Sequence, residues 1–459
     1  MAHIAYLATK TLSHLNSSLG LCEQLASRGH EITYLSPIDY SNIVETHGFR
    51  FVHLKSFQKL KEQSQLLLRP RNPLSFVRWF RKKRALRLTS LRSTEIEDSL
   101  NELKIDLQII DTEFHCAIIS SQALSSPTFL HQIFFCYQKS NRNPPLNSSL
   151  IPTPENQKTI DSAWNELEHE TKHLNSPKFR KTSLTQYLRI VDPLTSRFSD
   201  LKAFAKAKNF SLRKETTTTN FLRPFSYNHL PILSTSLREL EFLNDFPSNF
   251  HHIGPLFGSR FSVKTNSESL LLWNEFKQRH LFSSSSPTLI YVTLGSFWAT
   301  DLDFLQRLIT AFKNRPEWSL VIGLGNQSIP SKLEPLPENV LALDWAPQQE
   351  ILPLCQCALI HCGASSIYEC LYHGVPILGY SGKEVDQNGN AARLQFHKIA
   401  LLGDKDIDSS SDIENKIAAT LADSEIKKNT LIFRDHILRY HQNQTVATTV
   451  ERLLEKSTY

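Results

Sequence analysis

The sequence lacks the long apolar runs of a membrane-spanning protein. No apolar stretch among its 459 residues approaches the roughly 18 residues that a membrane-spanning helix needs. The first apolar stretch, from Ile4 to Ala8, is too short and too quickly interrupted to be the core of a signal peptide, so it predicts a strand. Any contact with a membrane is therefore expected to be peripheral.

Cysteine is too scarce and too irregularly placed for a disulfide-stabilised protein. The seven cysteines are an odd number, include no CxxC pair and lie in a chain too long to need disulfide staples. We therefore expect a protein of the reducing cytoplasm, either free or held at the inner face of the membrane.

Two patterns imitate metal sites, but neither predicts one. Cys355, Cys357 and His361 lack a fourth ligand and the usual spacing of a tetrahedral zinc site, so we expect buried thiols there. Asp301 and Asp303 stand at the start of an expected helix, where carboxylates cap the backbone and complement the helix dipole. The sequence therefore predicts no metal and no resident cofactor.

Acidic residues are absent between Glu62 and Glu95, although the net charge of the whole chain is only +6. Within that gap the basic segment 69–92 interleaves arginine and lysine with aromatic residues. Such a segment could hold the protein on an anionic membrane surface, but a solvated helix face is the more common use of such a pattern. Nucleic acid is not an expected partner, because the charge is confined to one segment and no recognition module accompanies it.

Length and patterning predict a folded α/β protein with two domains. Hydrophobic residues make up 40% and charged residues 21%, as in an ordinary globular chain, and 459 residues exceed what one core usually supports. Apolar runs of strand length alternate with helical stretches, which is typical of parallel sheets. The expected strands are Ile4–Ala8, Glu31–Leu35, Phe49–Leu54, Leu107–Asp111 and Thr128–His131, then Leu289–Leu294, Leu320–Gly323, Val340–Leu343, Ala358–His361, Pro376–Tyr380 and Ile399–Leu402.

The two series of alternating strands and helices predict two doubly wound domains. We expect the first domain over residues 1–248, a linker over 249–261 around Gly254 and Pro255, the second domain over 262–440, and a final helix over 441–459. Because ligands of such folds bind at the carboxyl ends of the strands, the expected site is the cleft between the domains.

The most informative segment places a tight turn of small residues between a strand and a helix. The strand that ends at Ile360 leads into this turn, and the helix after it carries a glutamate. Backbone N–H groups and the dipole at such a helix start attract phosphate, and the glutamate could accept hydrogen bonds from ribose hydroxyls. The candidate residues are His361, Gly363, Ser365, Ser366 and Glu369.

Further candidates flank this turn. Trp345, Ala346 and Gln348 follow the strand Val340–Leu343, where an aromatic ring and an amide suit the stacking and edge recognition of a base. Asp386 and Gln387 offer a carboxylate and an amide, which hydrogen-bond sugar hydroxyls. Each feature alone has a commoner structural use, so the prediction depends on their combination.

This combination resembles the donor-binding signature of the UDP-glycosyltransferase superfamily, glycosyltransferase family 1, which has the GT-B fold. The signature runs from WxPQ through HxGxxSxxE and GVP to DQxxNA. Its counterparts here are Trp345–Gln348, then His361, Gly363, Ser366 and Glu369, then Gly374–Pro376, then Asp386 and Gln387 with Asn390 and Ala391. Gly295 and Ser296 resemble the family's glycine–serine turn near the donor phosphates.

The N-terminal part, with residues 13–17 and 25–33, resembles the family's opening strand, loop and helix. The resemblance implies that His14 is the general base and that Asp111 orients it. A carboxylate on one ring nitrogen fixes the tautomer of a histidine and stabilises its charged form. The sequence departs from the family pattern at Ser13, Ser17, Cys362 and Ser365, which we interpret as drift.

The resemblance implies an inverting, metal-independent enzyme that moves a hexose, such as glucose, from a UDP-sugar to a hydroxyl group. The expected acceptor is a small lipophilic molecule such as a carotenoid, sterol, polyketide or phenolic, as in the bacterial zeaxanthin and macrolide glycosyltransferases that the motif spacing resembles. An alternative is a catalytically silent protein that binds nucleotide sugars. The presence of both His14 and Asp111 favours the enzyme.

Overall fold

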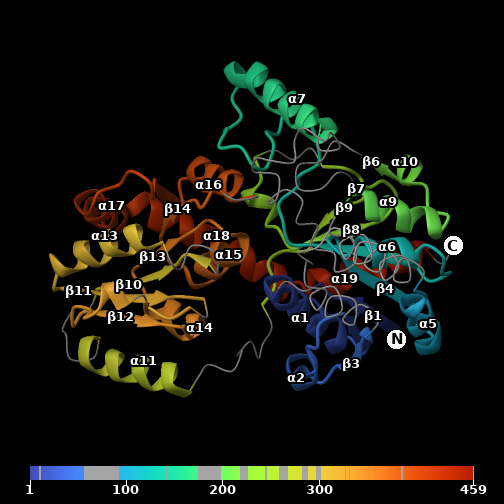
Figure 1. Ribbon diagram of the computed structural model, residues 1–459, viewed down its shortest axis with the longest axis horizontal. Coiled ribbons are helices and arrows are strands. Elements are labelled where there is room, and N and C mark those ends of the chain that lie inside the picture. The colour runs from blue at the N-terminus through green and yellow to red at the C-terminus, as the bar shows by residue number, and fades with distance from the viewer. Residues whose placement is uncertain are drawn as a thin grey trace, which may run out of the picture.

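A computed structural model of the chain shows two parallel sheets, each covered by helices on both faces (Figure 1). The described residues are 1–9, 12–55, 93–140, 142–173, 198–217, 226–242, 246–257, 267–281, 288–295, 301–325, 327–329, 331–383 and 386–457. The basic segment 69–92, Ser296 and residues 258–261 of the expected linker lie outside these ranges. We call the parts that contain the first and second sheets the N-terminal and C-terminal halves.

The sheet of the N-terminal half has the strand order β3-β2-β1-β4-β5-β8-β9, and every neighbouring pair is parallel. Its strands are β1 (His3–Leu7), β2 (Glu31–Ser36), β3 (Arg50–His53), β4 (Leu107–Asp111), β5 (Thr128–Gln132), β8 (Ile232–Ser234) and β9 (Phe250–His252). The first five were predicted. The last two were not, and β9 lies inside the range that was expected to be linker.

The sheet of the C-terminal half has the order β12-β11-β10-β13-β14-β15, again with all pairs parallel. Its strands are β10 (Thr288–Thr293), β11 (Trp318–Gly323), β12 (Val340–Leu343), β13 (Cys357–Ile360), β14 (Ile377–Tyr380) and β15 (Ala400–Gly403). All six were predicted within one or two residues. Their apolar runs are nearly continuous because helices bury both faces of the sheet.

Helices pack on both faces of each sheet. In the N-terminal half they are α1 (Leu12–Ser27), α2 (Ser41–Val44), α5 (Glu95–Leu103), α6 (His115–Ser121), α7 (Gln157–His173), α9 (Phe198–Ala207) and α10 (Leu212–Glu215), beside a short hairpin of β6 (Thr216–Thr217) and β7 (Ser226–Tyr227). Those that follow are α11 (Ser267–His280), α13 (Leu302–Lys313), α14 (Gln348–Ile351), α15 (Ala364–His373), α16 (Gln387–Phe396), α17 (Ser410–Ala422), α18 (Ser424–Gln442) and α19 (Thr445–Ser457). None of these described helices is both long and apolar enough to cross a membrane.

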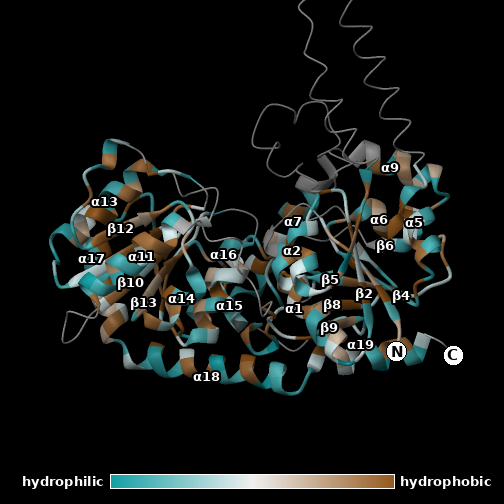
Figure 2. Ribbon diagram, turned by 90° about the horizontal axis from the view of Figure 1, so that it is seen from below, coloured by the Kyte–Doolittle hydropathy of each residue, from teal (hydrophilic) through white to brown (hydrophobic). Residues whose placement is uncertain are grey.

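The last helix returns to the N-terminal half. Figure 2 shows α18 leading from the second sheet towards the first, with α19 continuing beneath the first. Val446, Ala447 and Val450 of α19 are buried in the same core as Leu15 and Leu19 of α1. The two halves are therefore joined by α18 and α19 as well as by the chain between the sheets.

Candidate active site

A buried histidine–carboxylate pair lies at the carboxyl edge of the first sheet. Because β1 and β4 are parallel neighbours, the helix after β1 starts beside the end of β4. His14 on α1 thereby meets Asp111, the last residue of β4, with 2.7 Å between Nδ1 and Oδ2. The Thr9 hydroxyl donates to the same carboxyl oxygen, and the Glu113 N–H donates to the other. These contacts hold the Asp111 carboxylate in one orientation.

The electrostatics of this pair favour a charged carboxylate. Burial alone would raise the pKa of Asp111, but the opposite charge and hydrogen bond of His14 outweigh it and hold that pKa below its usual value. A carboxylate only accepts hydrogen bonds, so the proton lies on Nδ1 of His14. In that tautomer Nε2 carries the lone pair that can accept a proton.

The turn before α15 surrounds the ring of a second predicted residue. His361, directly after β13, contacts the carbonyl oxygen of Thr293 through Nδ1 at 3.3 Å, and burial lowers its pKa. A Cβ atom on Gly295 would lie 3.0 Å from this ring, and one on Gly363 would lie 2.5 Å from its Nε2. Both glycines are therefore needed to leave room for the imidazole. Cys362, which precedes Gly363, has a φ of 61°, in the left-handed region that favours glycine.

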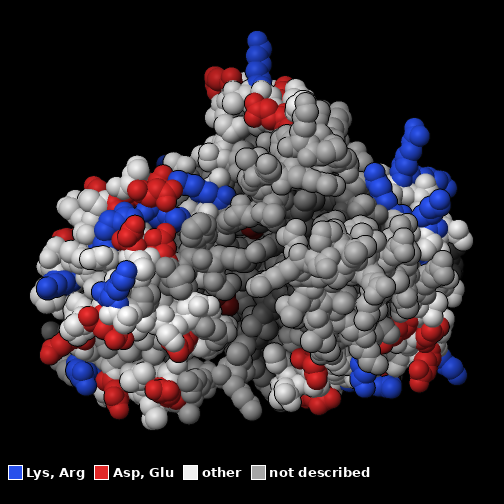
Figure 3. All heavy atoms as spheres, viewed as in Figure 1, with Lys and Arg blue, Asp and Glu red and all other residues white. Residues whose placement is uncertain are grey.

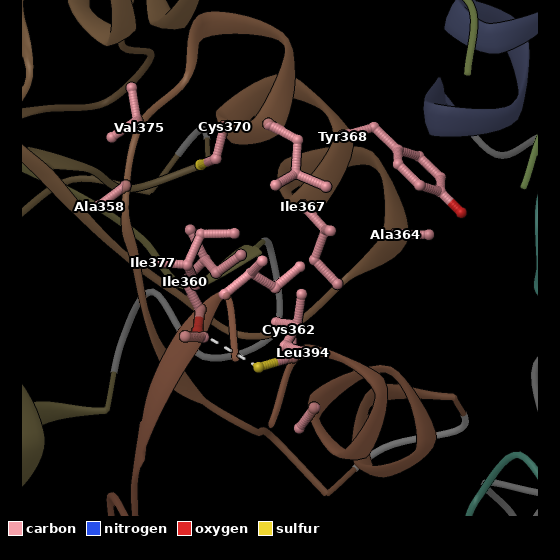
Figure 4. Packing of buried hydrophobic residues seen from close by; sticks show 14 of the residues in the cluster. Ala358, Ile360, Cys362, Ala364, Ile367, Tyr368, Cys370, Val375, Ile377 and Leu394 are labelled. Carbon is pink, nitrogen blue, oxygen red and sulfur yellow. Dashed lines mark hydrogen bonds between the residues drawn. The ribbon is translucent and has the colours of Figure 1, made fainter. Parts of the chain in front are cut away.

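The start of α15 has the features of an anion site. Its N-cap is Gly363, which has no side chain to accept hydrogen bonds from the first-turn N–H groups. Ser366 is buried in the first turn and Ser365 is half-buried. Figure 4 shows Ile360 of β13, Ile367 of α15 and Ile377 of β14 packed in one cluster, to which Cys362 of the turn also belongs. The turn is therefore held by a tightly packed core.

Two of the residues predicted to recognise the base and the ribose, Gln348 and Glu369, belong to one hydrogen-bonded group. Gln348 and Gln349 at the start of α14 both donate to the Glu369 carboxylate, and the Tyr291 hydroxyl donates to Gln348. Burial raises the pKa of Glu369 to about 7, partly opposed by the two amide donors. The loop between β12 and α14 carries Trp345 and Ala346, both half-buried.

The Asp386 and Gln387 pair lies at the start of α16 and faces the N-terminal half. Burial raises the pKa of Asp386 to about 6, although Asn390 donates to its carboxyl at 2.8 Å and the charge of His14 lowers that pKa. The Gly389 N–H of the same helix donates to the Leu146 carbonyl oxygen at 3.0 Å, so the start of α16 lies against the N-terminal half. Gln387 Oε1 is buried and has no hydrogen-bond partner among the described residues. Figure 3 shows a hollow between the two halves with acidic side chains at its bottom.

The patterns that imitate metal sites have structural roles. The Asp301 carboxylate caps α13 by accepting from the Phe304 N–H, as predicted. It also forms an ion pair with Lys405. Cys357 is fully buried and Cys355 is half-buried. Within the described ranges, no group of three or more histidine, cysteine or acidic side chains could hold a metal ion.

The chain is similar to known sugar-transferring enzymes. Residues 271–447 match the model of the family described as UDP-glucoronosyl and UDP-glucosyl transferase. The demethyllactenocin mycarosyltransferase of Streptomyces fradiae is 24% identical over 99% of this chain and 87% of its own. The zeaxanthin glucosyltransferase of Pantoea ananas is 22% identical over 87% of this chain and 84% of its own. Residues 271–447 belong to the UDP-glycosyltransferase superfamily, and the whole chain is similar to its members. The protein is an enzyme that transfers sugars.

The solved structures confirm the GT-B fold of this glycosyltransferase. The glycosyltransferase of kitacinnamycin superposes with a TM-score of 0.66, covering 99% of both chains at 18% identity. The relatives support binding of a nucleotide-sugar donor, and ligands of such α/β folds bind at the carboxyl ends of the strands.

The sequence did not predict the residues that surround His14 in this glycosyltransferase. The Phe134 ring packs edge-on against the His14 ring, with 5.6 Å between centroids. His131 Nδ1 shares a hydrogen bond of 2.6 Å with the Tyr6 hydroxyl, and burial lowers the pKa of His131 to about 4, so this imidazole stays neutral. Its other nitrogen lies 3.4 Å from the hydroxyl of Ser17, one turn beyond His14 on α1. The one signal in the sequence was the position of His131 at the end of a predicted strand.

Proposed function

We propose that this enzyme moves a hexose, such as glucose, from a UDP-sugar to a hydroxyl group of a small lipophilic acceptor, with inversion at the anomeric carbon. The observation that carries the proposal is the buried pair of His14 and Asp111, which lies within electrostatic reach of Asp386 across the cleft. A catalytically silent binding protein has no use for an imidazole that a buried carboxylate orients opposite its donor site.

The mechanism is a single in-line displacement. His14 Nε2 removes the proton from the acceptor hydroxyl, whose oxygen forms a bond to the anomeric carbon while the bond from that carbon to the diphosphate breaks. Asp111 stabilises the imidazolium that results. The departing diphosphate is received by the N–H groups at the start of α15, with Ser365, Ser366 and His361 beside it.

The donor is recognised at both ends in this proposal. Glu369 accepts from the ribose hydroxyls, and Gln348 and Trp345 contact the base, which we infer to be uracil. Asp386 and Gln387 accept from the sugar hydroxyls, and the unpartnered Gln387 Oε1 is suited to that contact. Gly295 supports the diphosphate end by leaving room for the His361 ring.

A lipophilic acceptor suits the surroundings of the base. The Phe134 ring lies against His14 and offers an apolar contact. The two curated relatives act, by their names, on demethyllactenocin and zeaxanthin.

An anionic membrane surface is a further proposed partner, through the basic segment 69–92. Exposed Lys206 on α9 and Arg213 and Lys214 on α10 add basic residues in the same half. Flotation with anionic vesicles tests this contact, and no binding above that to neutral vesicles would refute it.

A donor and acceptor panel tests the function. The enzyme is incubated with UDP-glucose, other UDP-sugars and dTDP-sugars against a hydroxylated carotenoid, a macrolide aglycone, a sterol and a phenol. We expect a hexosyl mass increment on at least one acceptor with a UDP-sugar, and a β-linked product from an α-linked donor by NMR. A protein that binds UDP tightly but modifies none of the acceptors and releases no sugar would support the silent binding protein instead.

A further inference from the structure

A fully buried ion pair joins the two halves beside the cleft. Arg393 on α16 donates from Nε and Nη2 to Glu241 Oε2, at 3.0 and 2.7 Å. Glu241 directly follows the short 3-10 helix Arg238–Leu240 in the N-terminal half. The side chains of Arg393 and Glu241 are 1% and 0% exposed. This contact crosses between the halves in a region from which water is excluded.

Both partners are held by further contacts. The Arg393 guanidinium lies between the rings of Phe135 and Phe242, at 4.6 and 4.5 Å from their centroids. The Cys136 N–H donates to Glu241 Oε1 at 2.7 Å. Buried ion pairs often stabilise a protein less than apolar residues of the same volume, because both charges lose their hydration. A contribution to stability therefore does not explain why a buried ion pair lies at this position. The residues that surround the pair suggest a role in catalysis instead.

On one side the pair reaches the residues proposed to bind the donor sugar. Arg393 Nη1 donates to the carbonyl oxygen of Gly389 in the first turn of α16, at 3.1 Å. That turn begins with Asp386, whose carboxyl accepts from Asn390. The Gly389 N–H in turn donates to the Leu146 carbonyl of the N-terminal half, at 3.0 Å. The start of α16 is thus fixed to the opposite half at two places.

On the other side the pair reaches the base. Three consecutive residues after β5 make contacts with the base and with the ion pair. The Phe134 ring packs against the His14 ring. The Phe135 ring packs against the Arg393 guanidinium, and the Cys136 N–H donates to Glu241. The Gln132 side-chain amide donates hydrogen bonds to the carbonyl oxygens of Phe134 and Phe135, at 3.2 Å each. One short, hydrogen-bonded segment therefore connects the general base to the helix that carries Asp386.

We propose that Glu241 and Arg393 are positioning residues that set the distance between the donor sugar, held at the start of α16, and the base His14. The proposal rests on the proposed function, because it assigns the pair a role in that same transfer. Neither residue touches the reacting atoms. A displacement of about 1 Å at the reacting centre can cost about 10²-fold in rate, so the chemical step depends on the pair more than nucleotide binding does.

Three variants test the proposal by separating kcat from donor affinity. Arg393→Lys keeps the charge but loses the forked hydrogen bonds. Phe135→Leu removes one ring from the guanidinium without changing any charge. Because a lone buried charge can unfold a protein, the double variant Glu241→Leu with Arg393→Met replaces the pair with apolar groups. Calorimetry with UDP reports folding and donor affinity together, and the transfer assay reports kcat and KM.

We expect kcat to fall about 10- to 100-fold in each folded variant, with the Kd for UDP within about threefold of the parent value. The fraction of donor sugar transferred to water should rise, because the donor still binds but is misaligned. The matched control is Lys398→Met, which removes an exposed ion pair with Glu425 just beyond the end of α16. Its kcat should stay within about twofold of the parent.

The proposal is overturned if the double variant binds UDP and transfers sugar at the parental kcat, or if kcat and UDP affinity fall in the same proportion in all three variants. A parent enzyme that transfers no sugar would instead refute the proposed function. The two failures are therefore distinguishable in one series of assays.

Discussion

Replacing Glu369 with glutamine should remove a pH dependence of stability that its half-buried, desolvated carboxyl imposes. In the folded protein burial raises the pKa of Glu369 to about 7, against a usual value of 4.5. The folded state therefore binds a proton more tightly than the unfolded state. The stabilisation from this proton is complete below pH 4.5 and is lost as the pH rises through about 7.

The size of the effect follows from the difference between the two pKa values. At about 1.4 kcal/mol per unit of pKa, the values of about 7 and 4.5 correspond to a loss of about 3 kcal/mol at high pH. Glutamine carries no charge at any pH, so Glu369→Gln does not suffer this loss. It gives up one acceptor for the amides of Gln348 and Gln349, which costs about 1–2 kcal/mol at every pH. The prediction therefore concerns how the difference in the free energy of unfolding between Glu369→Gln and the parent changes with pH.

Urea unfolding of parent and variant at pH 5 and pH 8 measures this variation. We expect the free energy of unfolding of Glu369→Gln, relative to the parent, to rise by about 2–3 kcal/mol between the two pH values. The exposed Glu350 on α14 is the control, because Glu350→Gln should show no such rise. Parallel curves for the parent and Glu369→Gln would refute the reasoning, since the carboxyl would then ionise as it does in water.

Three other predictions concern the cleft. Asp111→Asn should lower kcat by about 10²-fold or more while the Kd for UDP is kept, because the amide no longer fixes the tautomer of the base; an unchanged kcat in the transfer assay would contradict this. Binding of UDP at pH 8 should take up a proton at His361, whose lowered pKa rises beside the diphosphate; calorimetry in two buffers of different ionisation enthalpy measures the uptake, and His361→Gln should lack it. Gly389→Ala should reduce kcat and Tm together, because its Cβ would lie 2.1 Å from the Leu146 carbonyl oxygen; parental values of both would show that the halves do not meet there as described.

Much of the fold was predictable because both sheets are parallel and buried. Strands such as β4 and β13 are fully buried and so read as short apolar runs. The strands β8 and β9 have only three residues each and contain polar or aromatic side chains such as Ser234 and His252, so they gave no such signal. A final helix was predicted over 441–459, but a prediction for one helix does not reveal that α19 packs against α1.

The candidate site was predictable where its residues are close in sequence or belong to a motif. His361, Gly363 and Glu369 follow from one strand, turn and helix. The contact between His14 and Asp111 joins residues 97 positions apart and was predicted only through the family resemblance. Glu241 and Arg393 are 152 positions apart, and a glutamate or arginine at either place is ordinary for a surface. Only the packing of the two halves shows that both are buried.

The rate of sugar transfer by His14→Ala, measured beside its affinity for UDP, tests the central claim most directly. The account predicts that transfer falls by about 10²–10⁴-fold, the usual contribution of a general base, while calorimetry gives a Kd for UDP close to that of the parent. Transfer at the parental rate by a variant without this imidazole would contradict the assignment of His14 as the base.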